Sequence, residues 1–224
     1  MPRDIPPLPR LHAVTDDVLL GRSDFPELAR VVMAAGRERF ALHLRGRGTS
    51  GARLYELAAA LRPAARALGA LLLVNDRVDV ARVADLDGVH LAAHSLPPAV
   101  ARGLLPPERW VGMSVHDPAA ARAAAEHVDY LVVGTVFATP THPGRTGAGP
   151  EVVARVRAVT SLPLLAIGGI GPERVPEVVA AGASGVAVLS GIWGAPDPGA
   201  AVTEFLRHLP DGAAAEAPRS ALAG

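Results

Sequence analysis

The feature that most constrains the fold is a regular alternation of short apolar runs with longer amphipathic stretches along almost the whole chain. Alternation of this kind is typical of strands joined by helical crossovers, which places the strands in one parallel sheet. The predicted strands cover residues 11–15, 40–45, 71–75, 88–91, 110–115, 130–137, 164–167 and 185–189. The predicted helices cover residues 25–35, 51–68, 78–84, 98–105, 118–126, 150–159, 172–181 and 200–209.

The number and character of these units favour a closed barrel. Runs such as residues 71–74 are apolar throughout, which indicates burial on both faces of a parallel sheet. Eight β/α units predict an α/β fold, a single (β/α)8 TIM barrel over residues 11–209. The alternative is an open doubly wound sheet, but the chain lacks the glycine-rich fingerprint after the first strand. We predict an N-terminal extension over residues 1–10 and a disordered, Ala-, Gly- and Pro-rich tail over 210–224.

Composition excludes several classes of function. The 22 basic residues balance the 22 acidic ones, which argues against a nucleic-acid partner held by bulk charge. The absence of cysteine rules out disulfides, thiolate metal sites and cysteine nucleophiles. No apolar run approaches the roughly 18 residues of a membrane span, and residues 1–10 lack the apolar region of a secretory signal. We therefore expect a cytoplasmic protein with a small-molecule ligand and no membrane or nucleic-acid partner, and the sequence leaves a homo-oligomer open.

Polar residues gather where the predicted strands end, which is where barrels of this kind place their active sites. Two glycine turns, Gly168-Gly169 and Ser190-Gly191, follow the last two strands. Because glycine lets backbone N–H groups approach an anion, and barrels often bind phosphate after strands seven and eight, these turns predict a phosphate site. The alternative is that they are ordinary tight turns.

Two further groups follow the second and third strands. His43, Arg45 and Arg47 alternate along the second strand, so they are predicted to point together into the barrel mouth, where the guanidinium groups would suit a diphosphate or carboxylate. The alternative is a salt-bridged plug. Asn75 and Asp76 end the third strand, and Asp76 is predicted either to hold Mg²⁺ or to cap the following helix.

Two other segments have plainer interpretations. His90 lies within a predicted strand and is interpreted as a core histidine rather than a ligand. Residues 139–149 combine Thr, His, Arg and glycines, and they are interpreted either as a mobile lid or as a solvated connection.

Four motifs in order resemble one family: Asn-Asp-Arg-Val-Asp at 75–79, Gly-Val-His-Leu at 88–91, Gly-Thr-Val-Phe-Ala-Thr-Pro-Thr at 134–141 and Ala-Ile-Gly-Gly-Ile at 166–170. Together they are similar to thiamine-phosphate synthases and their TenI-type relatives over nearly the whole chain. The resemblance implies a (β/α)8 barrel. In the synthases it implies Mg²⁺-dependent joining of a hydroxymethylpyrimidine diphosphate to a thiazole phosphate, with release of pyrophosphate. TenI-type relatives include tautomerases that move a proton on a carboxythiazole phosphate.

Carried over by position, the resemblance assigns roles to individual residues. It places Thr139 and Thr141 near the thiazole phosphate, with Gly169 and Ser190 in its backbone cradle. It places Arg45, Asn75 and Ser114 at the pyrimidine diphosphate, and makes Asp76 a metal carboxylate. The chain departs from the synthase pattern at four positions: His43 replaces Gln, Arg47 replaces Lys, Ser95 replaces the second metal carboxylate and His142 replaces Lys.

Three functions remain, and all of them include a thiazole phosphate ligand. The leading interpretation is a TenI-like tautomerase, since His43 and the segments 11–17 and 114–116 are TenI-like. The general-base His of the tautomerases is Thr135 here, and a hydroxyl is a poor base. The catalytic candidates are His43, Arg45, Ser114 and His142. The alternative is the synthase, the only one of the three that calls for Mg²⁺. The third is a non-catalytic phosphate-ligand binding or regulatory protein.

Overall fold

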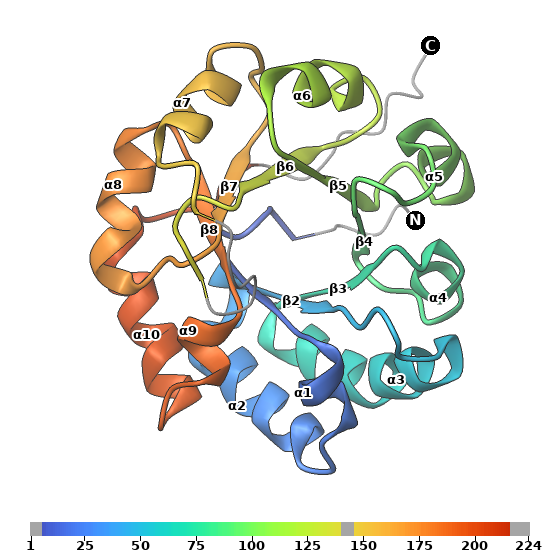
Figure 1. The fold of residues 1–224 in the computed structure, drawn as a ribbon. Coiled ribbons are helices and arrows are strands. Elements are labelled where there is room, and N and C mark those ends of the chain that lie inside the picture. The colour runs from blue at the N-terminus through green and yellow to red at the C-terminus, as the bar shows by residue number, and fades with distance from the viewer. Residues whose placement is uncertain (1–5, 140–145, 216–224) are drawn as a thin grey trace.

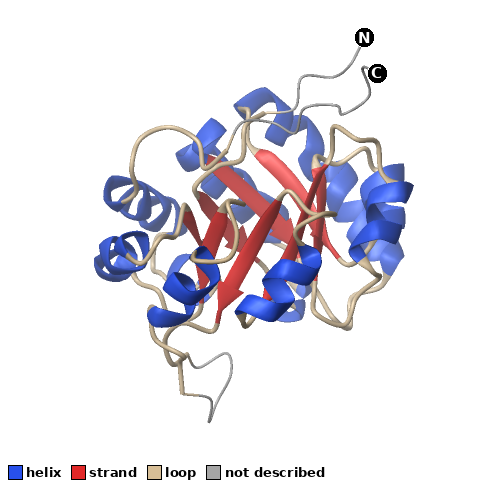
Figure 2. Cartoon of the chain, turned by 90° about the horizontal axis from the view of Figure 1, so that it is seen from above, coloured by secondary structure: helices blue, strands red, loops and turns tan. Residues whose placement is uncertain are grey.

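The computed structural model describes residues 6–139 and 146–215. Eight parallel strands close into a barrel in chain order, and β8 pairs with β1. The strands are β1 Leu11–Val14, β2 Phe40–Leu44, β3 Leu71–Asn75, β4 Gly88–Leu91, β5 Trp110–Val115, β6 Tyr130–Gly134, β7 Leu164–Ile167 and β8 Gly185–Val188. Figures 1 and 2 show these strands at the centre, with helices outside them.

The helices lie on the outer face of the sheet. They are α1 Asp17–Gly21, α2 Phe25–Gly36, α3 Gly51–Leu68, α4 Val78–Val83, α5 Pro98–Leu104, α6 Pro118–Ala124, α7 Glu151–Arg157, α8 Val175–Ala180, α9 Ser190–Trp193 and α10 Pro198–His208, with short 3-10 turns η1 Arg37–Arg39 and η2 Pro172–Arg174. Among the described residues, no helix is both long and apolar enough to span a membrane.

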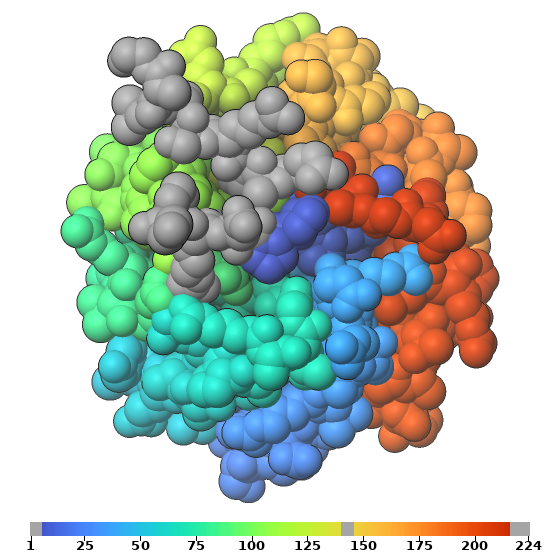
Figure 3. Space-filling model, turned by 180° about the vertical axis from the view of Figure 1, so that it is seen from behind, coloured from blue at the N-terminus to red at the C-terminus, as the bar shows by residue number. Residues whose placement is uncertain are grey.

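The apolar side chains divide into two clusters. The larger one fills the layer between strands and helices, and the smaller one fills the barrel interior with residues such as Leu71, Trp110 and Tyr130. These three residues begin their strands and therefore lie at the amino-terminal end of the barrel. Leu8 joins the inner cluster and pairs with Ala215 through an N–H to O distance of 2.8 Å. Figure 3 shows the dark blue N-terminal residues beside the red C-terminal residues at the centre of this face.

The predicted barrel is confirmed, with differences at some element ends. The strand predicted over 130–137 ends at Gly134, because the pairing with β7 slips by one residue there: Leu131 N donates to Pro163 O in register, but Val136 N, rather than Thr135 N, donates to Ile167 O. The helix predicted over 172–181 divides into η2 and α8. Helices α1 and α9 have no predicted counterpart. Helix α1 begins where the Asp16 side chain accepts a hydrogen bond from Leu19 N at 2.9 Å.

The segments predicted to flank the barrel are described only in part. Residues 8 and 211–215 lie against the barrel, with Ala214 N donating to Leu8 O at 2.7 Å. Residues 1–5 of the extension predicted over 1–10, and residues 216–224 of the disordered tail predicted over 210–224, lie outside the described residues.

Candidate functional site at the carboxyl ends of the strands

The loop that follows β2 is anchored to the start of α1 by one carboxylate. Asp17 accepts hydrogen bonds from the backbone N–H groups of Arg47 and Gly48, both at 3.0 Å, and from the Thr49 hydroxyl at 2.7 Å. The Thr49 hydrogen bond is the largest cause of a lowered Asp17 pKa. Asp17 was not among the predicted site residues, yet it fixes the path of the loop that carries both predicted arginines.

Arg45 is half-buried at the end of β2, and its backbone N–H donates to the Thr15 hydroxyl at 2.8 Å. Burial and the neighbouring Arg47 lower its pKa, whereas Asp76 and Asp17 act in the opposite direction. The charges of these four side chains therefore act on one another where β1, β2 and β3 end. Within residues 6–139 and 146–215, no ion pair joins either arginine, so the salt-bridged plug finds no support there.

His43 lies inside the barrel rather than in the open mouth, which corrects the expected pointing of this side chain. It is 1% exposed. Its Nε2 lies 2.7 Å from His12 Nδ1, and its Nδ1 lies 3.3 Å from Asn75 Oδ1. Burial lowers the pKa of His43 to about 4. Alternation along an extended strand would place His43, Arg45 and Arg47 on one face. Because β2 ends at Leu44, this alternation does not extend to Arg47.

His90, interpreted as a plain core residue, belongs to a polar cluster. Its Nε2 lies 2.8 Å from Ser114 Oγ, and its ring lies 5.4 Å from that of His43 and 5.7 Å from that of Tyr130. Burial, followed by His43 and Arg45, lowers the pKa of His90. Among the described residues, His90 Nδ1 and Tyr130 Oη have no hydrogen-bond partner. A polar interior of this kind could not be recognised from a single histidine in an apolar strand.

Asp76 does not cap α4, since Arg77 occupies the cap position without a side-chain hydrogen bond. Its Oδ1 instead accepts a hydrogen bond from Ala92 N at 2.8 Å, in the loop that follows β4. That loop contains Ser95, whose N–H donates to Ala92 O at 3.0 Å. Asp76 and Ser95 thus lie on two loops that are joined by a hydrogen bond. The described residues contain no cluster of three or more metal-ligating His, Asp or Glu side chains.

The glycine turn after β7 is tightly fitted. Gly168 and Gly169 have φ values of 106° and 62°, and a Cβ on Gly169 would lie 2.4 Å from Ala138 O. Arg174 donates to Gly169 O at 3.2 Å and stacks over the Phe137 ring at 4.3 Å. Only glycine fits this backbone without strain. The absence of a side chain lets the backbone of the turn lie close to the segment that follows β6, which contains Phe137 and Ala138. Ser190 and Gly191 begin α9, next to this turn in the barrel order.

Some predicted residues fall at the edge of the described chain or beyond it. Thr139 is the last described residue before the gap, and Thr141 and His142 lie outside the described residues. The loop returns with hydrogen bonds from Ala148 N to Thr135 O and from Gly149 N to Val136 O.

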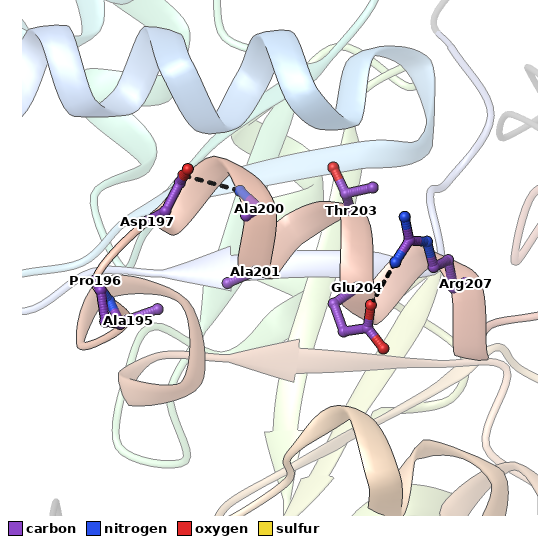
Figure 4. Close-up of a pocket in the computed structure, with 8 residues that line it drawn as sticks. All are labelled: Ala195, Pro196, Asp197, Ala200, Ala201, Thr203, Glu204 and Arg207. Carbon is purple, nitrogen blue, oxygen red and sulfur yellow. Dashed lines mark hydrogen bonds and ion pairs between the residues drawn. The ribbon is translucent and has the colours of Figure 1, made fainter.

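A hollow on the outside of the barrel contains none of the predicted site residues. It is lined by α10 and the turn before it, including Asp197, Glu204 and Arg207. Figure 4 shows the Glu204–Arg207 ion pair and the Asp197 cap of α10 along this surface. The charged and polar groups that could act on a substrate lie instead where the strands end.

The fold and this mouth define the class of the protein: a (β/α)8 barrel with arginines, a carboxylate and glycine turns at the carboxyl ends of its strands. A family model described as thiamine monophosphate synthase matches residues 11–192. The chain belongs to this thiamine-phosphate synthase/TenI family, which confirms the resemblance.

Individual relatives carry the synthase name. A thiamine-phosphate synthase from Methanoculleus marisnigri is 42% identical over 207 residues, which cover 92% of this chain and 95% of that protein. A thiamine biosynthesis bifunctional protein ThiM/ThiE from Symbiobacterium thermophilum is 48% identical over 156 residues, 69% of this chain but 32% of that protein. The solved structure of a thiamine phosphate pyrophosphorylase from Pyrococcus furiosus has a TM-score of 0.76 at 31% identity, with 89% of this chain and 94% of that chain covered.

Proposed function

We propose that this chain is a thiamine-phosphate synthase, which joins a hydroxymethylpyrimidine diphosphate to a thiazole phosphate and releases pyrophosphate. The observation that carries the proposal is the anchored loop after β2, which presents Arg45 and Arg47 at the mouth without a competing ion pair among the described residues. Guanidinium groups bind diphosphate oxygens through paired, charge-assisted hydrogen bonds. The synthase names of the relatives support the same reaction.

The reaction forms a carbon–nitrogen bond between the two rings and breaks the carbon–oxygen bond to the diphosphate, which leaves with the bonding electrons. Charge therefore accumulates on the leaving group. Arg45 and Arg47 would stabilise that charge, and their fixed loop would require little reorganisation as the bond breaks. The glycine turn at Gly168-Gly169 follows β7, three strands from β2 around the barrel, and would hold the thiazole phosphate.

The residues around Asp76 fit Mg²⁺ only together with the substrate. One Asp76 oxygen is engaged by Ala92 N, and Ser95 supplies no charge. Mg²⁺ in proteins is commonly held by one or two carboxylates with substrate phosphates and waters, so Asp76 and the diphosphate would hold the ion jointly. Bound there, the ion would neutralise part of the diphosphate charge.

The tautomerase reading that led on sequence gains no support from the comparisons, whose relatives carry the synthase name. The structure also weakens the expected base, because His43 is buried, has partners at both ring nitrogens and has a pKa lowered to about 4. A base works best when its pKa lies near the operating pH.

The test is turnover by the purified chain with both phosphorylated substrates, with and without Mg²⁺, followed as thiamine phosphate and pyrophosphate formed. We expect Mg²⁺-dependent turnover that falls at least tenfold in Arg45→Ala and is unchanged in Arg207→Ala, a 70% exposed control on α10. Turnover of a carboxythiazole phosphate alone would favour the tautomerase. Thiazole phosphate binding without any turnover would favour the non-catalytic protein.

A further inference from the structure

A chain of hydrogen-bonding groups runs through the barrel interior from its amino-terminal end to its mouth. His12 Nε2 lies 3.1 Å from Pro9 O, His12 Nδ1 lies 2.7 Å from His43 Nε2, and His43 Nδ1 lies 3.3 Å from the Asn75 side-chain amide. Both imidazoles are buried, and Asn75 is 8% exposed at the end of β3. Among the described residues, the ring of His12 contacts Pro9, His43 and Tyr130 inside the barrel, so any effect of His12 on the mouth passes through these neighbours.

The Pro9 carbonyl sets the direction of this chain. A carbonyl oxygen only accepts, so His12 must carry its proton on Nε2. A neutral imidazole has a single N–H, and burial lowers the pKa of both rings, so each is neutral near pH 7. His12 Nδ1 is then an acceptor, and it must receive the proton of His43 Nε2–H. His43 Nδ1 therefore carries no proton and is an acceptor.

A bare Nδ1 needs a donor, and the Asn75 amide can supply one only through its NH₂ group. The oxygen and nitrogen of an amide occupy nearly the same positions, so the hydrogen-bond network decides which of them faces His43. In the reverse arrangement, His43 carries its proton on Nδ1 and donates it to Asn75 Oδ1. His43 Nε2 then accepts the proton of His12 Nδ1–H, so His12 Nε2 has no proton and faces the Pro9 oxygen. That arrangement leaves two buried acceptors together without a proton.

We propose that His12 is a positioning residue that, through His43, turns the Asn75 NH₂ group inward and its carbonyl oxygen toward the mouth. The Asn75 subsite then takes a hydrogen-bond donor of the substrate, such as the amino group of an aminopyrimidine, rather than a phosphate oxygen. The diphosphate is left to Arg45 and Arg47. The choice of pyrimidine rests on the proposed function, whereas the direction of the hydrogen bonds does not.

The first test measures the direction itself in the wild-type protein. The ¹⁵N NMR shifts of the imidazole nitrogens distinguish protonated from bare nitrogens without any substrate. We expect both His12 and His43 to carry the proton on Nε2 at pH 7. A proton on His43 Nδ1 overturns the proposal, and this outcome is independent of whether the chain makes thiamine phosphate.

The second test removes the positioning residue. In His12→Phe, His43 is free to move its proton to Nδ1 and donate to the Asn75 oxygen, which turns the NH₂ group toward the mouth. We expect inorganic pyrophosphate to bind roughly tenfold tighter and the hydroxymethyl aminopyrimidine alcohol roughly tenfold weaker, as for one hydrogen bond gained or lost. Leu165→Val, in the same inner cluster but outside the hydrogen-bonded chain, is the control and should change neither affinity. If both affinities fall together or neither changes, the proposal is wrong, and if the variant does not fold the NMR measurement decides.

Discussion

His43 should make the stability of this protein depend on pH in a predictable direction. Burial lowers its folded-state pKa to about 4, from the 6.5 expected for an unfolded chain. As the pH falls below 6.5, the unfolded chain therefore binds a proton that the folded chain refuses. The stability that His43 contributes is fully present above 6.5 and is lost as the pH falls toward 4.

The size of the effect follows from the shift. A change from 6.5 to about 4 corresponds to about 3 kcal/mol, at roughly 1.4 kcal/mol for each pKa unit. By pH 4.5, about 2 kcal/mol should already be lost through this one side chain. Burial is the largest cause of the lowered pKa values of His12 and His90, ahead of the charge of His43, and burial persists in a His43 variant, so most of their contribution cancels in a comparison.

The assay is urea denaturation of the wild-type protein and His43→Gln at pH 7 and pH 4.5. Glutamine keeps a donor and an acceptor at this position but cannot take up a proton, so the variant should lose about 2 kcal/mol less than the wild type over this interval. His127→Gln, at an exposed position after α6, is the matched control and should follow the wild type. Equal losses in the wild type and His43→Gln would refute a neutral, buried His43.

The remaining predictions concern the mouth. Gly169→Ala places a Cβ 2.4 Å from Ala138 O at a φ of 62°, so calorimetry should show thiazole phosphate affinity reduced at least tenfold, while Gly103→Ala, which meets no atom within 4 Å, should leave it unchanged. Asp17→Ala removes the hydrogen bonds that anchor the loop after β2, which carries Arg45 and Arg47. Steady-state kinetics should show the KM for the pyrimidine diphosphate raised roughly tenfold and the KM for the thiazole phosphate unaltered. A rise in both KM values would indicate general damage to the fold. Ser95→Asp adds a carboxylate near Asp76, and a Mg²⁺ titration of turnover should reach half its maximum at roughly tenfold lower Mg²⁺; an unchanged midpoint would show that Asp76 and Ser95 do not share a metal.

Local sequence signals predicted the strands and helices well because each depends on a few neighbouring residues. The apolar run at 71–75 and the helix at 51–68 have the bounds that the structure gives them. Misplaced ends occur where the register with a distant strand changes, as at Val136, whose N–H donates to Ile167 O one residue out of step with the β6–β7 ladder. Helix α1 escaped prediction because it is only five residues long, too short for an amphipathic pattern, and the signal for its start is the single side-chain cap of Asp16.

The sequence by itself determined the β/α order, the polar residues at the strand ends and the glycine turns, because their patterns are local. Only the tertiary structure decided which of these residues meet. Parallel pairing of β1 with β2 and of β4 with β5 sets His12 beside His43 and His90 beside Ser114, pairs that are 31 and 24 residues apart in the chain. It also joins Asp17 to the loop after β2, which is 30 residues away. Such contacts depend on register and strand order around a closed sheet, and no single stretch of sequence contains that information.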